Sequence, residues 1–131
     1  MSSRLVLISC EPVLHDLLVD QLRGDFQIVA AARSMDDALA VARSASADVI
    51  LFDADLAKGD PADLIAKLTL VSAAPIVAMS AHAPPGSVES AGILAAGARA
   101  IVAKPAGPLP LDLTGNLGET LVSSLQRVVS S

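Results

Sequence analysis

The chain of 131 residues carries 14 acidic and 9 basic side chains, giving a net charge of −5, and it contains two Phe but no Trp or Tyr. This length predicts a single domain spanning residues 1–131, and an acidic chain poor in aromatic rings lacks the basic surface and stacking platforms of nucleic-acid-binding proteins. Polar, Gly or Pro residues interrupt every apolar stretch before the roughly 18 residues that a membrane span needs. With no apolar signal region near the start either, we expect a cytoplasmic protein without a membrane span.

Five short apolar runs, rich in β-branched residues and bounded by turn residues, predict strands. They lie at residues 5–8, 26–29, 49–52, 76–79 and 100–103. Runs that are apolar at nearly every position are typical of strands buried on both faces of a parallel sheet.

Apolar residues at helical spacing predict helices that follow these strands. The expected helices lie at residues 12–24, 34–42, 60–68, 87–96 and 114–129. Ser34 and Asp37 form the pattern of an N-terminal capping box, and Gly97 ends the fourth helix. Strand and helix alternate five times without a hairpin signal, which predicts an α/β domain with helices on both faces of a parallel sheet. Ligand sites of such sheets lie at the carboxyl ends of the strands.

Three polar side chains follow consecutive strands at that edge. Asp53 follows the third strand, Ser80 the fourth and Lys104 the fifth. This arrangement resembles the site of response-regulator receiver domains, the phosphoacceptor modules of two-component signalling, and the resemblance runs from Arg4 to Val129. It implies a flavodoxin-like (βα)5 fold whose five parallel strands have the order 2-1-3-4-5.

The resemblance implies a role for each of these residues. Asp53 would be the phosphoacceptor, Ser80 the hydroxyl that contacts the phosphoryl group, and Lys104 the counter-ion of the product. In the family, Mg²⁺ held by neighbouring acids neutralises the phosphoryl oxygens, as expected of a reaction that depends on positioning and charge neutralisation. The implied partners are proteins: a histidine kinase, a chemotaxis protein or an effector.

The last third of the chain has a finer resemblance. The Pro84-Pro85-Gly86 stretch, the small-residue helix before Gly97 and the Lys104-Pro105-Ala106-Gly107 segment are similar to the receiver domain of chemotaxis methylesterases. That similarity implies a final helix at about residues 114–129 leading into a catalytic domain, which would begin after Ser131.

The first strand departs from the family pattern. Receiver domains end this strand with two acids that hold the metal, whereas this chain has Ser9 and Cys10, followed by Glu11. Mg²⁺ prefers hard oxygen ligands in octahedral geometry, which a thiol supplies poorly. We therefore expect no cofactor other than weakly bound Mg²⁺, with Asp53, Asp55 and Glu11 as its candidate ligands.

Two hypotheses of function follow. The first is an atypical receiver domain that is not an enzyme and acts through protein contacts, with weak or absent Mg²⁺-dependent phosphorylation. The second is a working phosphoacceptor, phosphorylated on Asp53 by a histidine kinase, with Glu11 or Asp55 replacing the missing acids, and forming the regulatory domain of a methylesterase-like response regulator. A nucleotide-binding α/β domain is a weaker third reading, because no Gly-rich turn follows the first strand.

The fourth helix and the fifth strand raise the question of a contact surface. We expect the apolar residues of this helix, which are Val88, Ala91, Ile93 and Leu94, to lie mostly in the core. If the face made by helix four, strand five and helix five exposes Ile or Leu side chains, it becomes a docking or homodimer surface. Ile101 occupies the position where the family has an aromatic switch residue.

Overall fold

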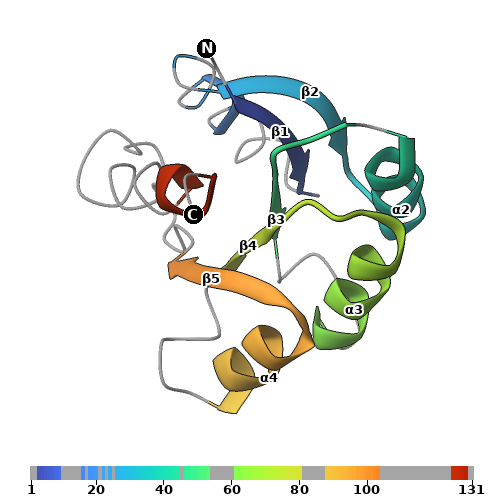
Figure 1. The fold of residues 1–131 in the computed structure, drawn as a ribbon, viewed down its shortest axis with the longest axis vertical. Coiled ribbons are helices and arrows are strands. Elements are labelled where there is room, and N and C mark those ends of the chain that lie inside the picture. The colour runs from blue at the N-terminus through green and yellow to red at the C-terminus, as the bar shows by residue number, and fades with distance from the viewer. Residues whose placement is uncertain are drawn as a thin grey trace.

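The structure is a computed structural model that describes residues 3–9, 16, 18–20, 22, 24, 26–44, 46–53, 61–80, 88–103 and 125–129, with the backbone alone at residues 35, 61, 80, 88–90 and 103. Five strands form one parallel sheet in the order β2-β1-β3-β4-β5 (Figure 1). They are β1 Ser3–Ile8, β2 Phe26–Ala32, β3 Val49–Asp53, β4 Ile76–Ser80 and β5 Ala98–Ala103. The predicted strand order is confirmed. Each predicted strand lies within an observed strand, which is longer by one to three residues.

Three helices connect these strands on one side of the sheet: α2 Met35–Ser44, α3 Pro61–Val71 and α4 Val88–Ala96. The predicted cap of α2 is present, because the Asp37 N–H donates to Ser34 Oγ at 3.2 Å and the Ala38 N–H donates to the Ser34 carbonyl at 2.9 Å. The described residues of the predicted first helix, which are residues 16, 18–20 and 22, are helical, and so are residues 125–129 of the predicted last helix.

Two separate apolar cores cover the two faces of the sheet. Val6 and Ile8 of β1 belong to the core under α2, α3 and α4. Leu5 and Leu7 belong to the other core, which also contains residues 18, 22 and 125 of the two helical segments on that face. Figure 1 shows α2, α3 and α4 on one side of the sheet and residues 125–129, in red, on the opposite side. Because both faces are covered, the strands are apolar at nearly every position.

The start of β3 is fixed to β1 by a pair of hydrogen bonds. The Arg4 N–H donates to Asp48 Oδ2 at 2.8 Å, and the Asp48 N–H donates to the Arg4 carbonyl at 2.8 Å. These bonds precede the pairing of Leu5 with Val49 and of Ile8 with Phe52. A slip of one residue would turn every side chain of β3 to the opposite face, so this contact helps to set which face receives Asp53.

The prediction for α4 is partly wrong. Ile93 is buried, but Ala91 is exposed and Leu94 is 46% exposed, while the side chain of Val88 lies outside the described residues. Positions 91 and 94 are three residues apart and therefore share one side of the helix, whereas Ile93 points toward the sheet. The small residues of this helix made the apolar pattern too uniform to reveal which side faces solvent.

A glycine allows α4 to pass directly into β5. Gly97 has φ +133°, a conformation that only glycine adopts readily, and a Cβ there would lie 2.8 Å from Cγ2 of Thr69 on α3. The predicted helix end at Gly97 is therefore confirmed, and its cause is both the backbone conformation and the close approach of α3. No helix within the described part of the chain has the length and apolar character that crossing a membrane requires.

Candidate functional site

Two polar residues are buried side by side at the carboxyl ends of the central strands. Asp53 is the last residue of β3, Ser9 directly follows β1, and both are 0% exposed. The Ser9 N–H donates to the Ala32 carbonyl at 3.0 Å, so β1 remains bonded to β2 for one residue beyond its end. Because Ile8 is paired with Phe52, the next position along both strands brings Ser9 beside Asp53.

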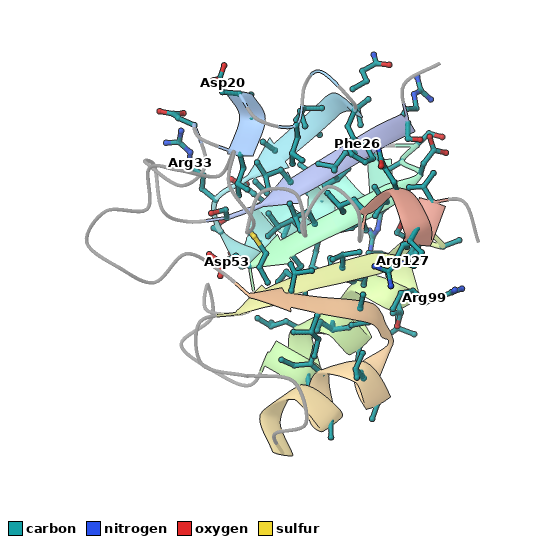
Figure 2. All side chains as sticks on the ribbon, turned by 90° about the vertical axis from the view of Figure 1, so that its left-hand side faces the viewer. Asp20, Phe26, Arg33, Asp53, Arg99 and Arg127 are labelled. Carbon is teal, nitrogen blue, oxygen red and sulfur yellow. The ribbon has the colours of Figure 1, made fainter. Side chains whose placement is uncertain are left out.

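The alternation of side chains places Ser9 and Asp53 on the same face of the sheet. Leu7 and Leu51 are paired and belong to the same core cluster. Side chains two positions apart along a strand lie on one face, so Ser9 follows Leu7 and Asp53 follows Leu51 on that side. Figure 2 shows Asp53 at one end of the sheet, with Arg99 and Arg127 at the other.

The side chain of Ser9 differs from most buried polar groups in its hydrogen bonding. Its Oγ is buried and has no hydrogen-bond partner in the described part of the protein. A buried hydroxyl without a partner costs about 1–3 kcal/mol, and native proteins contain few such groups. Ser9 is therefore an unusual residue at this position, and it lies next to the carboxylate that the sequence singled out.

The structure describes only some of the predicted site residues. Ser80 ends β4, and since Asp53 is paired with Met79, the backbone of Ser80 lies one position beyond Asp53 on the neighbouring strand. The side chain of Ser80 is not described. The other predicted site residues, which are Cys10, Glu11, Asp55 and Lys104, lie outside the described residues.

The contact between Arg4 and Asp48 was not predicted from the sequence. It helps to set the strand register that brings Ser9 beside Asp53, although it lies at the opposite end of the strands. The sequence does contain a signal for this contact, because the acidic residue Asp48 directly precedes a buried strand. Its partner Arg4, however, is 44 residues away in the chain. Sequence spacing alone does not identify such a partner.

The described residues do not fit a Mg²⁺ site. The family resemblance implies this ion, which takes oxygen ligands in octahedral geometry and is usually held by one or two carboxylates. Here the residue beside the Asp53 carboxylate is a neutral hydroxyl, and no group of three or more metal-binding side chains occurs in the part of the chain that the structure describes. The two described donors at this edge, the Asp53 carboxylate and the Ser9 hydroxyl, therefore carry less negative charge than a divalent cation favours.

A pocket lies at the other end of the sheet. It has a volume of about 270 Å³ and is lined by Ala42, Arg43, Ser46, Ala47, Val71, Ser72, Ala73 and Ala74. These residues lie at the ends of α2 and α3 and in the loops that lead to β3 and β4. The pocket is thus separate from the Asp53 edge.

Comparison with known proteins finds a matching family and structures with the same fold. Residues 6–112 match the sequence pattern of the response regulator receiver domain. A protein-glutamate methylesterase/protein-glutamine glutaminase of Halalkalibacterium halodurans is 25% identical over 117 residues, which is 86% of this chain and 34% of that protein. The chain therefore spans about a third of the length of this curated relative.

Two solved structures share the fold over the full length of the chain. The response regulator domain of Thermotoga maritima CheB has a TM-score of 0.87 and 17% identity, covering 100% of this chain and 98% of that one. A chain from the complex of the P1 domain of CheA3 with CheY6 of R. sphaeroides has a TM-score of 0.79 and 24% identity, covering 100% of both chains. At these identities the likeness establishes the fold.

Proposed function

The chain belongs to the response regulator receiver domain family, and from this membership we propose that it is an atypical receiver of two-component signalling. On this proposal it acts in the cytoplasm through protein contacts rather than as an enzyme, and Mg²⁺-dependent phosphorylation of Asp53 is weak or absent. The observation that carries the proposal is the buried, neutral Ser9 beside Asp53.

The charge of the site is the physical reason. Phosphoryl transfer to a carboxylate brings negative charge toward negative charge, and catalysis consists mainly of positioning the groups and neutralising that charge. A hydroxyl at Ser9 attracts a divalent cation less than a carboxylate would, because it supplies a dipole rather than a full charge. On this proposal Asp53 retains the position of a phosphoacceptor, but the divalent cation that would neutralise the phosphoryl oxygens binds weakly.

A contact surface supports a role through protein binding. Leu94 of α4 is 46% exposed, next to the exposed small residues Ala91, Gly92 and Ala95 of the same helix. We propose that the face of α4, β5 and the last helix binds a protein partner, which is a histidine kinase, a chemotaxis protein or an effector, or a second copy of the chain. Exposed apolar side chains that lie together favour such contacts.

The alternative is a working phosphoacceptor. It is favoured by the burial of Asp53 at the carboxyl end of β3, beside the backbone of Ser80. The phosphoryl group would leave a phosphohistidine nitrogen of a histidine kinase as the P–N bond breaks, and a P–O bond would form to an Asp53 carboxylate oxygen. The chain would then be the regulatory domain of a methylesterase-like response regulator, as its similarity to the methylesterase suggests.

Intact mass spectrometry separates the two proposals. The protein is incubated with acetyl phosphate and MgCl₂, alongside Asp53→Asn as the matched control. The atypical receiver gives no added mass, or a small fraction of modified chains. A stoichiometric gain of one phosphoryl group that is missing in Asp53→Asn establishes the alternative and refutes our proposal.

A further inference from the structure

The buried hydroxyl of Ser9 is the strongest unexplained feature of the molecule. Its Oγ has no hydrogen-bond partner in the described part of the protein, its residue is 0% exposed, and the strand alternation turns it to the same face as Asp53. Burying a polar group without a hydrogen bond destabilises the folded state. Such a group therefore marks a position where another residue type would make more favourable contacts with its surroundings.

We propose that the neutral side chain of Ser9 weakens divalent-cation binding at the Asp53 end of the sheet, and that a carboxylate at this position creates a divalent-cation site with Asp53. This inference rests on the proposed function and names one residue that weakens the metal-dependent step. It concerns binding alone, so it is measured without a phosphoryl donor.

The geometry supports this role. Neighbouring strands lie about 4.8 Å apart, and positions 9 and 53 are adjacent in register on adjacent strands. Two carboxylates at that spacing and on one face can both direct oxygens at one cation, whereas the present pair offers one carboxylate and one hydroxyl. Mg²⁺ needs few protein ligands because it retains several waters, so one added carboxylate changes the donor set substantially.

The same geometry predicts the behaviour of the substituted protein without metal. Two buried carboxylates on adjacent strands repel each other and lose their hydration, which destabilises the folded state. A cation bound between them removes this repulsion and stabilises the fold by mass action. The Ser9→Asp variant should therefore melt below the parent protein in EDTA and recover when a divalent cation is added.

The experiment measures thermal unfolding by circular dichroism in EDTA and in increasing MgCl₂ or MnCl₂. For Ser9→Asp we expect a melting temperature that rises with the cation, and a Mn²⁺ affinity at least tenfold above that of the parent protein. Ser9→Asn is the matched control, since it has the shape of Asp without its charge, and its melting temperature should not respond. The response should also disappear in Ser9→Asp combined with Asp53→Asn.

Two results would overturn the inference: a parent protein that responds to the cations as strongly as Ser9→Asp, or a folded Ser9→Asp that does not respond. If Ser9→Asp does not fold in EDTA, refolding in MnCl₂ provides the same test, and the parent protein is titrated with Mn²⁺ while broadening of the Ser9 and Asp53 amide signals is followed. Broadening at submillimolar Mn²⁺ in the parent contradicts the inference.

The outcome is distinguishable from failure of the proposed function. A parent protein that binds no divalent cation but becomes phosphorylated on Asp53 refutes the function and leaves the inference intact. A parent protein that binds the cation but stays unphosphorylated refutes the inference and leaves the function intact.

Discussion

Removing the hydroxyl of Ser9 should stabilise the protein. Ser9→Ala deletes one buried oxygen that has no hydrogen-bond partner in the described structure, and it retains the Cβ and the backbone bond from the Ser9 N–H to the Ala32 carbonyl. The deleted group costs about 1–3 kcal/mol in its present environment. Part of this gain is lost because the missing atom leaves a small void, which costs some packing energy.

The expected net effect is an increase of about 1 kcal/mol in the free energy of unfolding, corresponding to a melting temperature higher by about 3–5 °C for a domain of this size. Urea unfolding followed by far-ultraviolet circular dichroism measures it, since the chain has no Trp. The urea dependence should stay the same while the midpoint rises, because the surface exposed on unfolding is nearly unchanged.

Ser34→Ala is the matched control. The Ser34 hydroxyl accepts a hydrogen bond from the Asp37 N–H at the start of α2, and losing such a cap costs about 1 kcal/mol. The same substitution should therefore have opposite signs at the two serines. A Ser9→Ala variant that is less stable than the parent by 1 kcal/mol or more would refute the reasoning, because it would mean that the hydroxyl is hydrogen-bonded in solution.

Further predictions concern the contacts that hold the site in place. Asp48→Ala removes the acceptor of the Arg4 N–H and should lower the free energy of unfolding by about 1–2 kcal/mol in urea, while Asp48→Asn, which keeps an acceptor oxygen, should lose less than half of that. An equal loss in both variants would show that the charge matters rather than the hydrogen bond. Gly97→Ala should cost about 2–3 kcal/mol, because it strains the positive φ and drives a Cβ to 2.8 Å from the Thr69 methyl group. Thr69→Ser removes that methyl group and should recover part of the loss in a double-mutant cycle; strictly additive effects would contradict the steric explanation.

The sequence predicts the sheet well because every strand is buried on both faces. An uninterrupted apolar run such as residues 49–52 has few alternatives to a central parallel strand, and its end locates Asp53 at the carboxyl edge. The same logic predicts the end of β1 at Ile8. The unusual residue type at Ser9 was identified only by comparison with the receiver-domain pattern. The strand order came from the resemblance to receiver domains rather than from the apolar pattern.

Other features depend on long-range packing and were not predictable. The exposure of Leu94 depends on how α4 is rotated against α3 and β5, and a helix composed mainly of small residues contains little information about that rotation. The contact of Arg4 with Asp48 joins residues far apart in the chain. That Ser9 is buried without a hydrogen-bond partner is a property of its surroundings, since a serine after a strand is equally typical of a turn.

The central claim is that Asp53 lies in a receiver fold whose metal-dependent step is weakened. Its most direct test is the amide nuclear magnetic resonance spectrum of the parent protein before and after addition of MgCl₂ with beryllofluoride, which mimics a phosphoryl group on a carboxylate. We predict that the signals of Ser9, Asp53, Ser80 and Lys104 stay unchanged at millimolar concentrations. A saturable shift of these signals that disappears in Asp53→Asn would contradict the account and identify the chain as a working phosphoacceptor.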